Sequence, residues 1–181
     1  LVLQEMRQFD ALEADFMVFV APYYYGASQD VIYQHYVTIA AQSPVPVIVY
    51  NIPSRTHNPI TLDTIFKLAQ VENIAGVKDS SGDFAVFSRG VYANADPAFA
   101  WIQGEDYLDG PAFLVGADGI VTGLGNVWIE PYVAMYEASK AHNSAGIHQA
   151  QKQINALYEI IQRIGGKTIP AIKAGAAYFG R

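Results

Sequence analysis

Two residues of this 181-residue chain could together carry out chemistry on a carbonyl group. Lys78 closes the short apolar run Ile74–Val77 and precedes a Ser-Ser-Gly turn, a setting that none of the other five lysines has. Desolvation lowers the pKa of a lysine, and the neutral amine is a nucleophile towards carbonyls. The alternative is a lysine that extends from a strand end to solvent, and Lys78 taken alone favours this simpler interpretation.

Tyr50 makes a reactive role for Lys78 more favourable, because Tyr50 ends one predicted strand just as Lys78 ends the next. Neighbouring strands of a parallel sheet lie about 4.8 Å apart, so the two side chains can share a pocket if both point inward. A phenol beside an amine can move protons to and from a carbinolamine, an imine and a substrate hydroxyl. The alternative for Tyr50 is a packing role with its hydroxyl in water.

Other candidate residues carry weaker signals. The run Tyr23–Tyr25 follows a predicted strand, where aromatic runs often build interfaces. Arg55 could bind a carboxylate through its two-pronged guanidinium, although the local sequence slightly favours a solvated loop charge. Ser80 and Ser81 are expected to cap the helix that follows them. No cofactor or metal site is predicted, because the histidines show no ligand spacing: His35, His57, His142 and His148.

Apolar runs alternate with amphipathic helical patterns, which predicts βαβ units and a parallel sheet. Strands are expected at 16–21, 45–50, 74–78, 98–102 and 119–122, the first of them buried on both faces. Helices are expected over 1–15, after Ser28, after Thr61, and near 84–93, 107–115, 130–142, 147–164 and 169–179. The polar residues cluster at strand ends and no Gly-x-Gly-x-x-Gly follows a strand. These features of the α/β pattern fit a (β/α)8 barrel and weaken a dinucleotide-binding doubly wound sheet. A barrel needs eight strands and only five are counted, so either three strands are missing or the fold is an open sheet.

Composition narrows the range of partners. The formal net charge is -6 and no basic run occurs, which argues against nucleic acid as a partner. The absence of cysteine excludes disulfides and thiolate metal sites. No apolar run approaches the length of a membrane span, and no signal peptide is visible. We therefore expect no membrane association and a cytoplasmic location.

Four motifs occur in an order that resembles one enzyme family. They are Pro22-Tyr23-Tyr24, Tyr50-Asn51-Ile52-Pro53-Ser54-Arg55-Thr56, Gly76-Val77-Lys78-Asp79 and Gly116-Ala117-Asp118-Gly119. With Tyr50 and Lys78 28 residues apart, the chain resembles the dihydrodipicolinate synthase / N-acetylneuraminate lyase family of class I aldolases over nearly its whole length. The resemblance implies a partial (β/α)8 barrel, strands 4–8 of the family fold, over residues 1–128. It also implies a C-terminal helical region over 129–181, and a homotetramer.

The resemblance also assigns roles to individual residues. Lys78 would form a Schiff base with pyruvate or another 2-oxo acid, and Tyr50 would be the proton-transfer phenol. Tyr24 would be a second relay tyrosine, which in the synthases extends into a neighbouring subunit's site. The residues expected to line the substrate pocket are Gly104 and Val121.

The motifs disagree about the second substrate. Arg55 in its Ser-Arg-Thr setting resembles the synthases, where this arginine binds the carboxylate of an aldehyde substrate. The stretch Lys78-Asp79-Ser80-Ser81-Gly82-Asp83 is more similar to the sugar-acid aldolases, such as 2-keto-3-deoxygluconate aldolase. We therefore expect an aldolase or synthase that acts on a 2-oxo acid, with the aldehyde left open.

The chain also departs from the family. A Gly-Thr-Thr-Gly-Glu-like loop, which in the family holds the 2-oxo acid carboxylate, does not occur. The chain is expected to begin just before the fourth barrel strand and to stop before the family's last helix. Five strands would leave open sheet edges, so alone the chain is expected to aggregate and to be inactive. The alternative function is that of a noncatalytic 2-oxo-acid or sugar-acid binding relative, or of an inactive fragment.

Overall fold

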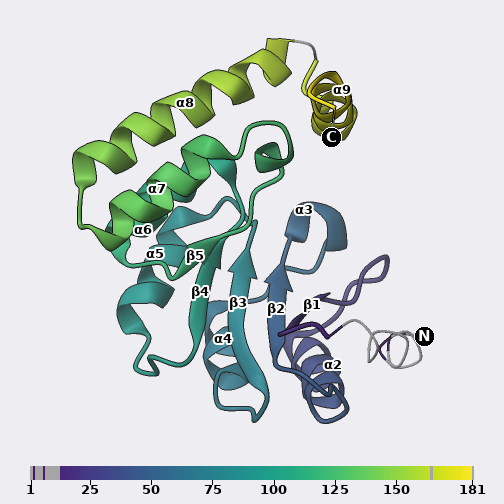
Figure 1. Cartoon of the computed structure of the whole chain (residues 1–181). Helices are drawn as coiled ribbons and strands as arrows, with labels where there is room; N and C mark the ends of the chain where they lie inside the picture. The colour runs from purple at the N-terminus through teal and green to yellow at the C-terminus, as the bar shows by residue number, and fades with distance from the viewer. Residues whose placement is uncertain (1, 3–5, 7–12, 164, 181) are drawn as a thin grey trace. The chain divides into compact units, whose positions relative to one another are not determined.

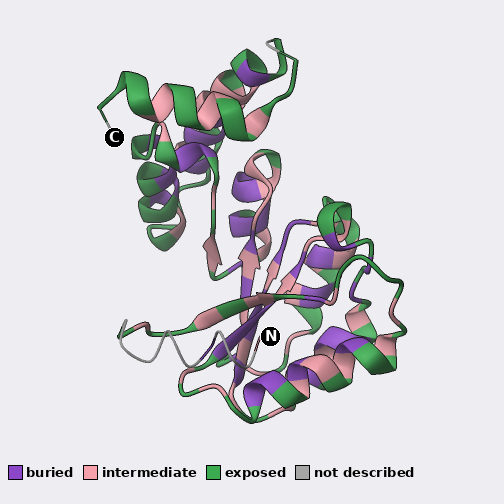
Figure 2. Ribbon diagram, turned by 90° about the vertical axis from the view of Figure 1, so that its right-hand side faces the viewer, coloured by how far each residue is buried: buried purple, intermediate pink, exposed green. Residues whose placement is uncertain are grey.

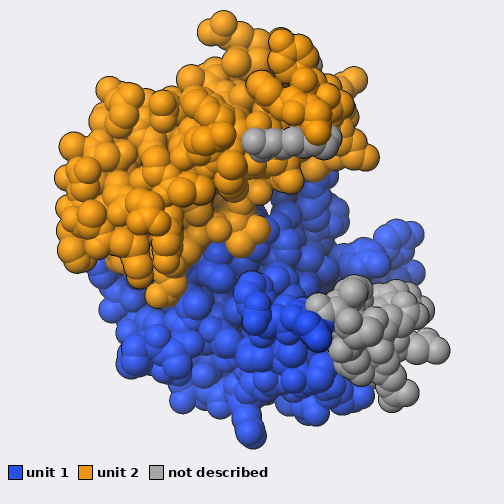
Figure 3. Space-filling view, in the orientation of Figure 1, with its two compact units in different colours: residues 1–102 blue, residues 103–181 orange. Residues whose placement is uncertain are grey.

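The computed structural model describes residues 2, 6, 13–163 and 165–180. The helix expected over residues 1–15 falls mostly outside these described residues. The chain divides into two compact units, unit 1 over Leu1–Ile102 and unit 2 over Gln103–Arg181 (Figure 3). Each unit is described by itself below, and the domain division predicted at residues 128/129 stays a prediction.

Unit 1 consists of parallel strands alternating with helices (Figure 1). Its strands are β1 (Met17–Val20), β2 (Val47–Asn51), β3 (Ile74–Asp79) and all but the last residue of β4 (Ala100–Gln103). Its helices are α2 (Gln29–Ala40), α3 (Pro53–Thr56), α4 (Leu62–Leu68) and α5 (Phe84–Ala93). Strands β1, β2 and β3 pair in parallel, with Val20 opposite Tyr50 and Tyr50 opposite Lys78. The predicted α/β pattern is therefore confirmed in this unit.

The core of unit 1 lies between the central strands and the helices that follow them (Figure 2). Val47, Val49 and Val77 are fully buried, as expected for central strands of a parallel sheet. Trp101 of β4 packs edge-on against Phe87 of α5. The core residues contributed by the helices include Ile32, Tyr36, Ile39, Ile65 and Leu68.

Strand β1 corrects one prediction. The run 16–21 was expected to be buried on both faces, but Phe16 and Val18 are 50% and 45% exposed. β1 stands first in the sheet order β1-β2-β3-β4-β5, and among the described residues no strand pairs with its other side. A continuous apolar run alone cannot distinguish such an end strand from a central one, because both have the same residue pattern.

The N-caps of α2 and α4 are the residues predicted from the sequence, but the N-cap of α5 is not. The side chains of Ser28 and Thr61 accept hydrogen bonds at the starts of α2 and α4, as expected. Ser80 and Ser81 do not cap α5. The cap is Asp83, whose Oδ1 accepts a hydrogen bond of 3.0 Å from the Val86 amide. The serine prediction was wrong because Asp83 stands directly before the first helical turn, where a carboxylate is preferred.

Unit 2 is mostly helical. It contains the single-turn helices η2 (Asp106–Leu108) and η3 (Leu124–Asn126) and the short strand β5 (Gly119–Ile120). Its α-helices are α6 (Asp109–Val115), α7 (Glu130–Lys140), α8 (Ser144–Arg163) and α9 (Thr168–Tyr178), close to the predicted ranges. The Val121 amide donates to the carbonyl of Gln103, the last residue of β4, at 2.8 Å. The core of the unit is formed between α6, α7 and α8, with Leu124, Met135 and Ile154 fully buried.

A buried carboxyl group stands out in this core. Asp109 at the start of α6 is 1% exposed, and neither of its carboxylate oxygens has a hydrogen-bond partner within the described part of the chain. Burial, followed by the nearby charges of Asp106 and Glu105, raises the pKa of Asp109 to about 8. The ionisable side chains of α7 and α8, the helices that share this core with α6, are exposed to solvent: Glu130, Glu137, Lys140, His148, Lys152, Glu159 and Arg163. The raised pKa therefore favours the neutral, protonated form of Asp109 at pH 7.

This protonation makes the free energy of unfolding depend on pH. Between the ordinary aspartate pKa of about 4 and the folded pKa of about 8, the folded state binds a proton that the unfolded state lacks. The free energy of unfolding should therefore fall as pH rises through this window, by at most about 1.4 kcal/mol per pH unit. Asp109→Asn should flatten this dependence and raise stability at pH 9, which urea unfolding at pH 5, 7 and 9 measures. Glu137→Gln, at an exposed position of α7, is the control, and an equal slope in both variants would contradict the assignment.

Candidate active site

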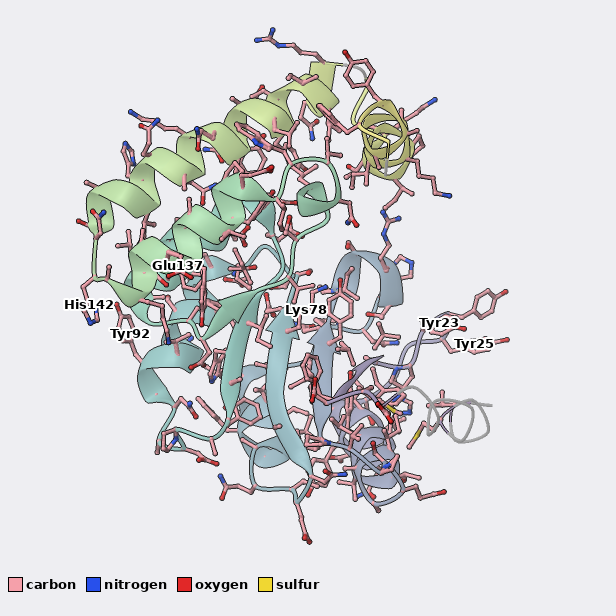
Figure 4. All side chains as sticks on the ribbon, in the orientation of Figure 1. Tyr23, Tyr25, Lys78, Tyr92, Glu137 and His142 are labelled. Atoms are coloured by element: carbon pink, nitrogen blue, oxygen red, sulfur yellow. The ribbon has the colours of Figure 1, made fainter. Side chains whose placement is uncertain are left out.

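Tyr50 and Lys78 meet at the C-terminal ends of two adjacent strands. They are direct partners in the β2–β3 register, and the Lys78 Nζ lies 4.0 Å from the centre of the Tyr50 ring. Both side chains are half-buried, and Lys78 lies near the end of the β3 arrow in Figure 4. The pair that the sequence singled out is therefore brought together, at a distance where an ammonium group is attracted to the ring face.

The Tyr50 hydroxyl has a further neighbour from the loop after β3. Ser80 Oγ donates to the Tyr50 hydroxyl oxygen at 3.4 Å, and Ser80 is 5% exposed. An amine, a phenol and an alcohol thus lie within one small region of unit 1. Such a set can supply a nucleophile and groups that exchange protons with a bound carbonyl compound.

A network of polar side chains that the sequence analysis missed lies one residue further along both strands. Asn51 Nδ2 donates to Asp79 Oδ2 at 2.7 Å, and both residues are buried. Ser81 donates to Asp79 Oδ1 through its backbone amide at 3.0 Å and through its hydroxyl at 2.7 Å. The sequence signal was available, because Asn51 follows Tyr50 as Asp79 follows Lys78.

The loop that carries Tyr24 is exposed but anchored. Tyr24 is 80% exposed and has a positive φ of 79°, which is uncommon for a residue other than glycine. Tyr23 and Tyr25, on either side of it, extend away from the strands in Figure 4. Asn58 is buried and ties the loop down, because its Nδ2 donates to the carbonyls of Pro22 and Tyr25 at 2.8 Å each.

Arg55 belongs to α3, which directly follows β2, and its side chain is exposed. Asn51, the last residue of β2, accepts the Ile60 amide through Oδ1 at 3.0 Å and so ties the segment after α3 back to the strand. Arg55 is therefore carried on a well-anchored connection. Its proposed binding role remains a prediction.

The two remaining predicted site residues belong to unit 2. The Gln103 side-chain oxygen accepts the amides of Gly104 and Glu105, at 2.9 and 3.0 Å. Val121 is 46% exposed and follows β5 directly. Gly104 thus lies in a turn organised by a buried glutamine, and pocket lining by Gly104 and Val121 stays a prediction.

Asp106 connects three elements of unit 2. Its Oδ1 accepts hydrogen bonds of 2.5 Å from the Thr122 and Tyr132 hydroxyls. Burial, followed by this hydrogen bond, raises the pKa of Tyr132. Asp106 also stands in the first turn of η2, so its carboxylate joins the start of this helix to both hydroxyls.

Two further findings bear on function. Over the described residues, no group of three or more histidine, aspartate or glutamate side chains is placed to hold a metal ion. Nor does the described part of the chain contain a helix long and apolar enough to cross a membrane.

The fold is that of a partial (β/α)8 barrel, and Lys78 and Tyr50 are paired at the ends of two adjacent strands. Residues 3–181 match the model of the dihydrodipicolinate synthetase family, and the chain belongs to this family. It is 35% identical over 150 residues to 4-hydroxy-tetrahydrodipicolinate synthase from Methanospirillum hungatei JF-1, covering 83% of this chain and 50% of that relative. The chain thus spans about half the length of the curated relatives it matches.

Solved structures show the same similarity. Dihydrodipicolinate synthase from Acinetobacter baumannii, complexed with pyruvate, superposes with a TM-score of 0.82 at 29% identity, covering 88% of this chain and 54% of that one. 2-keto 3-deoxygluconate aldolase from Picrophilus torridus superposes with a TM-score of 0.83 at 29% identity, covering 98% and 62%. Both enzyme types named by the sequence motifs are therefore among the structural relatives.

Proposed function

We propose that this protein is a class I lyase that forms a Schiff base between Lys78 and pyruvate or a related 2-oxo acid. The observation that supports the proposal is the placement of the Lys78 Nζ 4.0 Å from the Tyr50 ring centre, at paired strand ends. Family membership and the pyruvate complex of the Acinetobacter baumannii relative agree with it.

In this mechanism the neutral Lys78 amine attacks the 2-oxo carbon, and the carbonyl oxygen takes up a proton to give a carbinolamine. A proton delivered to its hydroxyl lets water leave and forms the imine. Loss of a proton from the adjacent carbon gives an enamine, which forms a carbon–carbon bond with an aldehyde, while the aldehyde oxygen is protonated. Water then releases the product and restores the amine, and the reverse sequence cleaves the bond. We assign these proton transfers to Tyr50, whose hydroxyl oxygen accepts a hydrogen bond from Ser80 Oγ.

The aldehyde partner is either a short aldehyde with a carboxylate, as for 4-hydroxy-tetrahydrodipicolinate synthase, or a sugar-derived aldehyde, as for the 2-keto-3-deoxy sugar acid aldolases. Arg55 supports the first and the Ser80-containing loop supports the second. We include Tyr24 in the proposal as a relay residue that acts across a contact between subunits of a homotetramer. Its 80% exposure leaves the side chain available for that contact.

The first prediction tests the covalent role of Lys78. Incubation with pyruvate and borohydride should leave a reduced adduct that peptide mass spectrometry maps to Lys78. Lys78→Ala should abolish the adduct, and Lys78→Arg should do the same, because a guanidinium stays protonated. Lys67→Arg, at an exposed position of α4, should keep the adduct. An adduct on another lysine would refute the proposal. The absence of any adduct in the unmodified chain would also refute it, and this second result would favour a noncatalytic binding protein.

The second prediction separates proton transfer by Tyr50 from packing. Tyr50→Phe keeps the ring beside Lys78 and removes only the hydroxyl. Turnover should fall by roughly 10²–10⁴-fold, the usual contribution of a general acid–base group, with little change in the thermal unfolding midpoint. Tyr92→Phe, at an exposed tyrosine of α5, is the control. Unchanged turnover in Tyr50→Phe would leave Tyr50 with a structural role alone.

The third prediction concerns the choice of aldehyde. Hydrogen bonds to charged groups contribute about 1.5–3 kcal/mol, so Arg55→Ala should lower kcat/KM for a carboxylate-bearing aldehyde roughly 10- to 100-fold. Turnover of neutral sugar aldehydes should change little. Arg89→Ala removes another exposed arginine of unit 1 and controls for net charge. An equal loss of kcat/KM for both aldehyde classes would show that Arg55 has a structural role and does not select the substrate.

A further inference from the structure

The register that joins Tyr50 to Lys78 also joins the two residues that follow them. Asn51 lies opposite Asp79, just as Tyr50 lies opposite Lys78. Because successive side chains of a strand point to opposite faces, the first pair lies on the face of the sheet opposite to the second. Asn51 and Asp79 are 3% and 4% exposed and share a hydrogen bond of 2.7 Å.

This register is not set by the beginning of the strands. Val47 pairs with Ile74, but Ile48 pairs with Gly76, so the pairing shifts by one residue at Ala75. A shift of one residue exchanges the faces on which side chains lie. The pairing at the start of the strands therefore does not fix which residue lies opposite Tyr50. A contact after the register shift, near the C-terminal ends of the strands, must hold Lys78 in that position.

The Asp79 carboxylate supplies this constraint, because both of its oxygens accept hydrogen bonds. Oδ2 accepts from Asn51 on the neighbouring strand, while Oδ1 accepts the amide and hydroxyl of Ser81 in the following loop. The Ser80 amide donates to the Asn51 carbonyl at 2.8 Å, which holds the residue that contacts the Tyr50 hydroxyl. One carboxylate thus fixes the strand pairing and the loop on which Ser80 lies.

The donors and acceptors in this arrangement are unambiguous. Asn51 Oδ1 accepts the Ile60 amide at 3.0 Å, so its Nδ2 must face Asp79 as the donor. Burial raises the pKa of Asp79, while the hydrogen bonds from Ser81 and Asn51 lower that pKa. These donors compensate a carboxylate that would otherwise be costly to bury.

We propose that Asn51 and Asp79 are positioning residues, a clamp between β2 and β3 that holds Lys78 against Tyr50 for imine formation. This inference rests on the proposed Schiff-base function. The clamp touches no substrate and acts through the backbone alignment of the two reactive residues. It also explains why the buried face of these strand ends carries a polar pair where apolar residues would pack more simply.

An exchange of the two side chains tests the clamp. Asp79→Asn alone sets a donor against a donor, at Asn51 if the new oxygen stays with Ser81 and at Ser81 if it turns to Asn51. Asn51→Asp alone places two carboxylates face to face. The double variant Asn51→Asp/Asp79→Asn restores one donor and one acceptor, and it keeps acceptors for the Ile60 amide and for Ser81. Each single variant should form the borohydride-trapped pyruvate imine roughly 10- to 100-fold more slowly, a loss typical of misplaced reacting groups. The double variant should recover most of the rate.

Two further readouts separate positioning from general stability. The pH profile of imine formation should shift in the single variants and return in the double variant. Hydrogen exchange of the Ser80 amide, which reports the strand pairing directly, should speed up and then recover in the same order. Asp83→Ala, which removes the α5 cap in the same loop, should lower stability and leave the imine rate unchanged.

The outcomes distinguish this inference from the proposed function. No imine in the unmodified chain would overturn the proposed function, while the Ser80 exchange data would still support or refute the clamp as a structural element. Imine formation at the normal rate in both single variants would refute the clamp. A double variant no better than the single variants would also refute it, and this comparison holds even if one single variant fails to fold.

Discussion

The parallel register between β2 and β3 is the constraint on which the site depends. A lysine and a tyrosine 28 residues apart in the sequence become direct neighbours only because Tyr50 pairs with Lys78. The strand cores that produce this pairing are apolar, and Val49 and Val77, one residue before the reactive pair, are fully buried. Hydrophobic burial therefore brings the strands together, while polar contacts at their ends decide which residues face each other.

Buried and half-buried amide side chains form many of the polar contacts at the strand ends of a chain without cysteine. Asn58 ties down the tyrosine loop, and Gln103 accepts two amides of the turn at Gly104. Asn73 donates to the carbonyls of Ala40 and Ser43 at 3.0 Å each, which closes the opposite end of unit 1. An amide can donate and accept at once, so one side chain satisfies several loop groups that would otherwise be buried unpaired.

The sequence predicts the order of the elements and the reactive pair because both follow from strong local patterns. Apolar runs ending in Tyr50 and Lys78 define strand ends, and the helical spacing in unit 2 is regular enough to place α7, α8 and α9 within a few residues. The exposure of Phe16 was not predictable, because it depends on whether another strand covers β1. The tie between Asn51 and Asp79 was missed because it depends on register across an irregular strand pair. The predicted pairing of Tyr50 with Lys78 would have given this register, because Asn51 and Asp79 are the next residues along the two strands.

Asp79 and Asp109 show how differently the two units treat a buried acid. Asp79 accepts three hydrogen bonds, and these favour the charged form that burial disfavours. Asp109 has no hydrogen-bond partner in the described residues and lies near two other carboxylates, so its neutral form is favoured and its pKa rises to about 8. In unit 2 the buried carboxyl of Asp109 has no hydrogen bond to offset its burial, whereas in unit 1 the hydrogen bonds to Asp79 offset part of the cost of burial beside the reactive pair. Three hydrogen bonds from two different segments hold the Asp79 carboxylate in one geometry, and that is the property a positioning residue needs, because its task is to keep Lys78 and Tyr50 aligned.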